Sequence, residues 1–253
     1  MQLEERLEQS RERFHALTEE IHKVLVGQQE AIRGALICLL CGGHALLEGV
    51  PGLGKTLMVK TLGQLLGLKF SRLQFTPDLM PADILGTNII MEDESGRRYF
   101  EFTYGPIFAH IVLADEINRA TPKTQSALLE AMQECHITVG GRTYPLEEPF
   151  IVLATQNPIE MEGTYPLPEA QVDRFFFKIL LDYPTQAELD EILVRHPSVM
   201  GGALAPKQAI TRDELLEARQ LIAQTPIAEP LRHYIVHLVS ATHPQAEEAP
   251  SLV

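Results

Sequence analysis

One eight-residue stretch constrains this chain more than any other. Residues 49–56 read Gly-Val-Pro-Gly-Leu-Gly-Lys-Thr and match the pattern G-x-x-x-x-G-K-[ST] at every fixed position. The stretch follows a short apolar run, residues 45–47, and precedes a helix-patterned segment, residues 57–66. A glycine-rich turn between a strand and a helix lets successive backbone N–H groups point at a polyphosphate. The sequence therefore predicts an α/β domain with a phosphate-binding loop here.

The last two residues of this loop have separate expected roles. Lys55 would reach the β and γ phosphates of a nucleotide, and Thr56 would hold Mg²⁺ through its hydroxyl. An apolar elbow ahead of the loop would border the adenine base with the backbone of Val26 and Gly27. We therefore expect ATP and Mg²⁺ as cofactors. The predicted nucleotide-contacting residues are Val26, Gly27, Gly49, Pro51, Gly52, Leu53, Gly54, Lys55, Thr56 and Leu57.

Two acids follow an apolar run sixty residues after Lys55. Residues 110–114 read as a buried parallel strand, which ends in Asp115 and Glu116. Acids at the carboxyl end of such a strand lie in the crevice where open α/β sheets bind ligands. We expect Asp115 to lie near the Mg²⁺ and Glu116 to act as general base on a water that attacks the γ phosphate. The alternative is a strand that merely ends in acids.

Two further polar residues are weaker candidates. Asn157 follows the apolar strand 150–154 and could bond the γ phosphate or the attacking water, or simply cap the turn before Pro158. Arg174 precedes the apolar strand 175–180; it could be a catalytic arginine or the partner of Asp173 in an ion pair. The residues themselves leave both alternatives open.

Composition narrows the class of protein. The 253 residues carry a net charge of −13, which argues against a protein that mainly wraps duplex phosphate. Three cysteines, no secretory signal and no run long enough to span a bilayer lead us to expect a reduced, cytoplasmic protein without a membrane span. Cys38 and Cys41 stand three residues apart in a helix-patterned run, so we expect both on its buried face.

The rest of the pattern places these candidates in a fold. Apolar runs predict five strands, at residues 44–48, 69–75, 110–116, 150–154 and 175–180. Two hairpins are expected outside this set, at 87–102 and 136–144, because β-like runs there flank glycine-containing turns. Helical patterns predict helices at 3–23, 28–41 and 122–134, and an all-α region from residue 183 onward.

Several blocks together resemble the MoxR family of AAA+ ATPases. They are the loop at 49–56, D-E-I-N-R-A at 115–120, Q-S-A-L-L-E-A-M at 125–132, A-T-Q-N-P at 154–158 and L-P-E-A-Q-V-D-R-F at 167–175. The resemblance covers essentially the whole chain. It implies a ring, commonly a hexamer, with ATP between subunits, in which Arg174 reaches into the neighbouring site. It also implies a partner that carries a von Willebrand factor A domain.

The resemblance divides the chain into two parts. Residues 1–182 would form the AAA+ nucleotide-binding core with an N-terminal helix and two inserted hairpins, and residues 183–253 a small helical lid. The sequence ends about where the family's sensor 2 segment begins, so we expect an incomplete lid. Arg119, in the D-E-I-N-R-A block, looks like an interface residue without an assigned role.

Three functions remain open at this point. The first is an ATP-hydrolysing machine that remodels or matures client proteins. The second is a nucleic-acid translocase or loader of the same AAA+ branch, which the overall acidity and the acidic first hairpin, with Glu92, Asp93 and Glu94, argue against. The third is a nucleotide-dependent scaffold with little turnover. A GTPase is disfavoured because the chain has no N-K-x-D motif.

Overall fold

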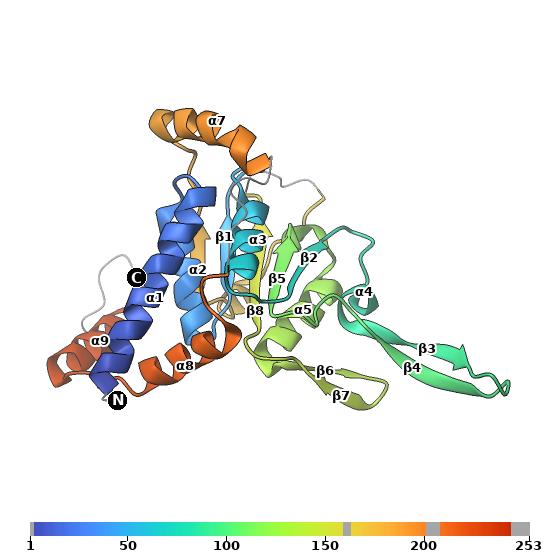
Figure 1. Ribbon diagram of the computed structural model, residues 1–253. Helices are drawn as coiled ribbons and strands as arrows, with labels where there is room; N and C mark the ends of the chain where they lie inside the picture. Colours follow the sequence, from blue (N-terminus) through green and yellow to red (C-terminus); the bar gives the residue numbers. More distant parts are fainter. Residues whose placement is uncertain (1–2, 159–162, 201–207, 244–253) are drawn as a thin grey trace.

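The centre of the fold is a five-stranded parallel sheet with helices on both faces. A computed structural model describes residues 3–158, 163–200 and 208–243 of the chain (Figure 1). The sheet has the strand order β2-β5-β8-β1-β9. Its strands are β1 (Ala45–Glu48), β2 (Phe70–Gln74), β5 (Ile111–Asp115), β8 (Ile151–Gln156) and β9 (Phe177–Leu180). The predicted α/β fold with five parallel strands is confirmed.

Alternate residues of the central strands feed two separate cores. Ala45, Leu113 and Leu153 face a cluster that also contains Leu17 of the first helix. Their chain neighbours, such as Leu46, Val112 and Val152, belong to a second cluster on the opposite face. Strands that are buried on both faces read as continuous apolar runs, which is why the sequence pattern located them well.

The two faces are covered by different helices. On one face lie α1 (Leu3–Val24), α2 (Gln29–Cys41) and α3 (Lys55–Leu65), and on the other α5 (Pro122–Glu134) with the short α4 (Pro81–Leu85). Short turns η1 (Ile117–Arg119) and α6 (Glu169–Val172) connect strands to the neighbouring elements. The helix after the phosphate loop begins two residues earlier than the pattern predicted, at Lys55.

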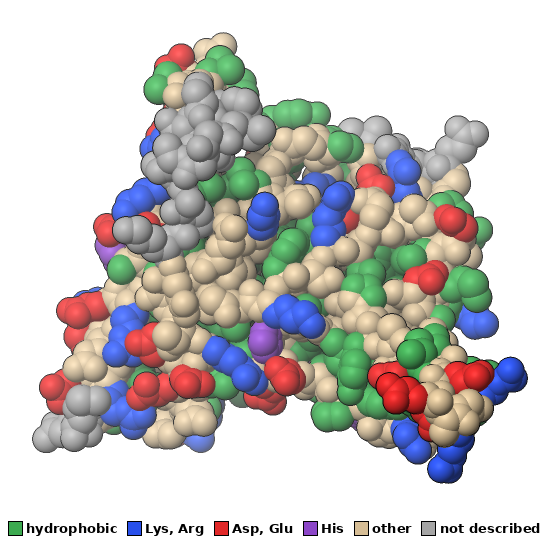
Figure 2. All heavy atoms as spheres, turned by 45° about the vertical axis from the view of Figure 1, so that its right-hand side comes forward, with side chains coloured by type: hydrophobic (Ala, Val, Ile, Leu, Met, Phe, Trp, Pro, Cys, Tyr) green, Lys and Arg blue, Asp and Glu red, His purple; other side chains and the backbone are tan. Residues whose placement is uncertain are grey.

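The two hairpins lie outside the central sheet. One pairs β3 (Gly86–Glu92) with β4 (Arg98–Tyr104), and the other pairs β6 (His136–Val139) with β7 (Arg142–Pro145). The first projects from the body of the molecule (Figure 1) and its outer end carries acidic and basic side chains beside apolar ones (Figure 2). At their bases the hairpins meet through stacked rings of Phe102 and Tyr144, with centroids 4.0 Å apart.

The C-terminal helices lie at different ends of the molecule. Helix α7 (Gln186–Met200) stands at the end opposite α8 (Arg212–Ala223) and α9 (Glu229–Ala241) (Figure 1). Leu215 of α8 and Ile210, two residues before the start of α8, belong to the core beneath α1 and α2. By contrast, α9 buries none of its residues.

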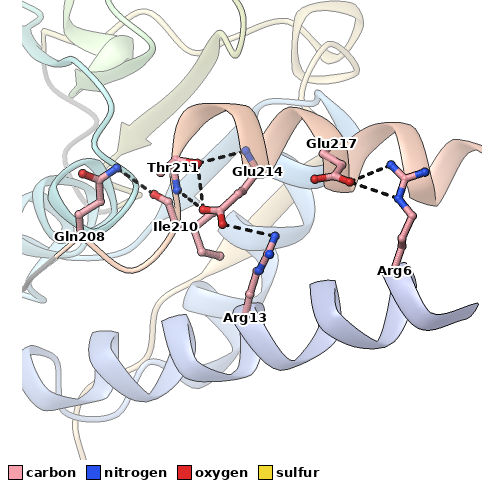
Figure 3. Close-up of polar contacts among 7 residues, drawn as sticks. All are labelled: Arg6, Arg13, Gln208, Ile210, Thr211, Glu214 and Glu217. Atoms are coloured by element: carbon pink, nitrogen blue, oxygen red, sulfur yellow. Dashed lines mark hydrogen bonds and ion pairs between the residues drawn. The ribbon is translucent and has the colours of Figure 1, made fainter. Parts of the chain in front are cut away.

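Charged pairs align α1 with α8. Arg6 donates to one Glu217 oxygen at 3.2 and 2.7 Å, and Arg13 lies 3.4 Å from Glu214 (Figure 3). The Glu214 carboxylate also accepts from the backbone N–H of Thr211, and the Glu214 N–H donates to the Thr211 hydroxyl oxygen, a capping box that starts α8. The two helices, from opposite ends of the chain, are therefore joined directly.

The two cysteines of α2 differ in exposure. Cys38 is buried as predicted, but Cys41 is exposed, because it is the last residue of α2 and the chain turns away there through Gly42 in a left-handed conformation. No helix within the described ranges is both long and apolar enough to cross a bilayer.

Candidate active site

The carboxyl ends of β1, β2, β5 and β8 open into one pocket of about 410 Å³. The pocket brings together five of the residues predicted to act in catalysis or metal binding, from three separate stretches of the chain. Its lining residues are Pro51, Gly52, Gly54, Lys55, Thr56, Leu57, Arg72, Gln74, Asp115, Glu116 and Asn157. Strand β8 lies between β1 and β5, so Asn157 projects between the phosphate loop and the two acids.

Glycine is required at different positions of the phosphate loop for different physical reasons. Gly52 and Gly54 adopt φ of 89° and 77°, a region that favours glycine, and a Cβ there would meet no atom within 4 Å. Gly49 is limited by space instead, because a Cβ would lie 2.9 Å from the Cβ of Leu181. The loop thus presents open backbone toward the pocket while its base packs against the chain beyond β9.

Lys55 is the first residue of α3 and lies half-buried in the pocket. Its ammonium donates to the carbonyl of Gly49 at 2.6 Å. Burial lowers the pKa of Lys55, and the carboxylates of Asp115 and Glu116 act in the opposite direction. Lys55 and both acids line the same pocket, and the lysine stands at the start of a helix whose free N–H groups attract anions.

Both oxygens of Asp115 already accept hydrogen bonds. The hydroxyl of Thr155 donates to Oδ1 at 2.7 Å, and Arg72 donates to Oδ2 through Nη2 at 2.7 Å and Nε at 3.2 Å. Thr155 also accepts from the backbone N–H of Glu116 at 2.9 Å. A single buried hydroxyl therefore sets the positions of both acids.

Glu116 sits in an uncommon backbone conformation with its own partners. Its φ of 58° and ψ of 50° lie in the left-handed region, which non-glycine residues seldom adopt. Its Oε2 accepts from the amide of Gln74 at 2.8 Å and lies 3.2 Å from Nε of Arg119. Arg119 therefore contacts the proposed general base within the same chain.

A smaller, mostly apolar pocket of about 200 Å³ adjoins the phosphate loop. Val26 lines it together with Leu53 and Leu57, so the elbow ahead of the loop does lie beside the predicted nucleotide site. Gly27 lies in the adjoining hollow, where the side chain of Glu188 from α7 packs against its Cα. Helix α7 also supplies Ile192 and Arg195 to the apolar pocket.

Arg174 is not among the residues that line either pocket. Its side chain is exposed just after α6. Within the described residues it makes no ion pair, so the alternative of a pairing with Asp173 is not seen there. The chain's own site is therefore built without it.

Sequence reasoning missed several residues of the site. Arg72 and Gln74 occupy alternate positions of β2, so both side chains point to the same face of the strand, next to the acids. Two long polar side chains on one face of a strand that also contains Phe70 and Leu73 were a usable signal. The contributions of Leu181, Ile192 and Arg195 come from segments far along the chain, and no local pattern marks them.

The residues present fit a nucleotide with a divalent cation. An open glycine loop, a lysine and a helix start suit a polyphosphate, and the hydroxyl of Thr56 with the carboxylate of Asp115 offers the oxygen ligands that Mg²⁺ prefers. The adjoining apolar pocket is lined by side chains suited to a flat base.

Comparison with known proteins agrees with this geometry. The sequence pattern of the ATPase family associated with various cellular activities (AAA) matches residues 44–177, more than half of the chain. The chain belongs to the AAA family of ATPases. Within this family it is a MoxR-type AAA+ ATPase, because it is 49% identical over 225 residues to a protein named chaperone MoxR1 from Mycobacterium tuberculosis.

Other relatives support the same placement. YeaC of Bacillus subtilis is 46% identical over 232 residues, covering 90% of this chain and 71% of that protein. The crystal structure of a putative ATPase from Cytophaga hutchinsonii superposes with a TM-score of 0.85 at 48% identity, covering 94% of this AAA chain and 71% of that one. The alignment with MoxR1 covers 88% of this chain but only 58% of MoxR1.

Proposed function

We propose that this AAA chain binds ATP with Mg²⁺ and hydrolyses it, and that the energy drives the remodelling or maturation of protein clients. The observation that carries the proposal is the single pocket lined by Lys55, Thr56, Asp115, Glu116 and Asn157. The relationship to a protein named chaperone MoxR1 supports a protein client over a nucleic acid, as does the net charge of −13.

Each residue has a definite task in this proposal. Lys55 and the backbone of the loop hold the phosphates, and Thr56 with Asp115 holds the cation, which neutralises charge on the β and γ phosphates when bound. Glu116 takes a proton from the attacking water. Asn157 bonds the γ phosphate or that water, and Thr155 keeps Asp115 and Glu116 in place through its hydroxyl.

Arg174 acts in a neighbouring subunit in this proposal. An exposed arginine outside its own chain's pocket is suited to an adjacent site, where its charge would accelerate phosphoryl transfer by a factor of about 10³ to 10⁵. A ring, commonly a hexamer, is the assembly that the MoxR family suggests. A von Willebrand factor A partner, a cytoplasmic location and a division into a core (1–182) and a lid (183–253) complete the hypothesis.

Replacing Glu116 separates nucleotide binding from hydrolysis. Glu116→Gln keeps the size of the side chain but removes the base, so we expect near-normal ATP binding and a loss of turnover of at least about 100-fold. Lys55→Ala should lose both ATP binding and turnover, because the lysine holds the phosphates. Binding of a fluorescent ATP analogue and release of phosphate are the two measurements.

Glu94→Gln, on the exposed turn of the first hairpin, is the matched control and should change neither quantity. Unchanged turnover in Glu116→Gln would contradict the assignment of the base.

A further inference from the structure

The guanidinium of Arg72 lies in the pocket, beside Asp115, the expected metal ligand. Arg72 lies on β2, and two of its nitrogens, Nη2 at 2.7 Å and Nε at 3.2 Å, donate to the same Oδ2 atom of Asp115. The Asp115 side chain is only 14% exposed, whereas that of Arg72 is 48% exposed. The acid is therefore mostly enclosed in the pocket, whereas the arginine, which also donates to Oε1 of Gln74 at 2.8 Å, is half exposed to solvent.

The remaining contacts leave Asp115 little free capacity for a second cation. Its Oδ1 accepts from the Thr155 hydroxyl, and that bond is part of the frame that also holds the backbone of Glu116. A divalent cation that used either oxygen would share one carboxylate with a guanidinium. Two positive charges a few ångströms apart repel each other strongly in a partly buried site.

We propose that Arg72 competes with the divalent cation for Asp115, so that cation binding requires the guanidinium to leave this carboxylate. Arg72 thereby sets the cation concentration at which the site becomes loaded. The inference rests on the proposed binding of ATP with Mg²⁺ at this pocket. It gives Arg72 a positioning role, because the side chain acts through Asp115.

The alternative role for Arg72 is a direct one. An arginine in the same pocket could instead bind a phosphate of the nucleotide, since the guanidinium fork suits phosphate as well as carboxylate. The two roles predict opposite results when Arg72 is removed: competition predicts tighter cation binding, whereas phosphate binding predicts weaker nucleotide binding even without a cation.

The test measures binding rather than turnover. A fluorescent, non-hydrolysable ATP analogue is titrated first in EDTA and then at fixed concentration with increasing Mg²⁺, for the wild type and Arg72→Met. We expect the half-saturating Mg²⁺ concentration to fall about fivefold in Arg72→Met, with the affinity in EDTA unchanged. The control Arg97→Met, on the exposed hairpin turn, should match the wild type in both titrations.

Repeating the Mg²⁺ titration with variants that also carry Asp115→Asn shows whether Arg72 and the cation compete for Asp115. In Asp115→Asn the carboxylate is gone, so the further change Arg72→Met should no longer lower the Mg²⁺ requirement. Three results would overturn the inference. The first is a lower Mg²⁺ requirement that persists in the double variant, and the second is an unchanged or raised Mg²⁺ requirement in Arg72→Met alone. The third is weaker binding of the analogue to Arg72→Met in EDTA. A wild type that does not bind the analogue in either titration would instead refute the proposed function.

Discussion

At the scale of single residues, His44 shows how a buried polar group connects two elements. One ring nitrogen accepts the N–H of Val152 at 3.0 Å, and the other lies 3.1 Å from the carbonyl of Met132. The neutral ring satisfies both partners, by accepting from one and donating to the other. Protonation would place a hydrogen on the accepting nitrogen and break the bond to β8.

This arrangement predicts a pH dependence of stability. Burial lowers the pKa of His44 below 6.5, the bond to Met132 opposes the shift, and the charge of Arg219 adds to it. Below about pH 6.5 the unfolded chain takes up a proton that the folded protein does not, so the free energy of unfolding falls as pH decreases.

Urea unfolding at several pH values between 7 and 5 measures this dependence. His44→Gln should reduce its slope by up to about 1.4 kcal/mol per pH unit. His233→Gln on the exposed α9 should leave the slope unchanged. Equal slopes in the wild type and His44→Gln would show that His44 does not determine this dependence.

Residues that act through a side-chain contact were the hardest to find from the sequence. Lys55, Thr56, Asp115 and Glu116 stand in motifs whose spacing reflects a backbone geometry, and all four line one pocket. Thr155 stands two residues before Asn157, but its hydrogen bonds to Asp115 and Glu116 depend on the packing of β5 against β8. A contact between strands forty residues apart leaves no local pattern.

At the scale of elements, the hairpins and the C-terminal helices differ in how well the sequence predicts them. Elements specified by neighbouring residues were predicted, and positions that depend on distant contacts were not. Both hairpins were predicted from their own turns and are present, because a hairpin is specified by neighbouring residues. The position of α8 was not predictable, because its place against α1 and α2 depends on contacts such as Leu215 in the shared core. The boundary at residue 182 stays a prediction, and the docking of α8 is a reason to test it.

Truncating Leu215 tests how much that docking contributes. The side chain is fully buried at 0% exposure, so Leu215→Ala leaves a cavity and should lower the free energy of unfolding by about 2–5 kcal/mol. Leu231→Ala, on α9 with 52% exposure, is the matched control and should change it by less than about 0.5 kcal/mol. Similar effects for the two variants in urea unfolding would mean that α8 is not part of the stable core.

At the scale of the whole molecule, the question is whether one chain is sufficient for hydrolysis. The pocket contains a proposed base, a lysine and a metal ligand, and its own two arginine neighbours, Arg72 and Arg119, contact the acids. Arg119 is held by Glu116. Arg72 is held by Asp115 or, by the inference above, leaves it toward solvent, so neither is directed at the γ phosphate. Arg174, exposed and outside the pocket, is the candidate for this role in the site of an adjacent chain.

Mixing two inactive variants decides whether Arg174 acts between chains. Arg174→Ala keeps an intact pocket but lacks the arginine, and Lys55→Ala has a damaged pocket but keeps the arginine. If Arg174 completes a neighbour's site, random mixing of equal amounts restores about a quarter of the wild-type sites, since each active site needs its pocket from one variant and its arginine from the other. Phosphate release by the mixture measures this. Because an arginine that acted on its own pocket could not be rescued, activity no higher than that of the separate variants would exclude the inter-subunit role.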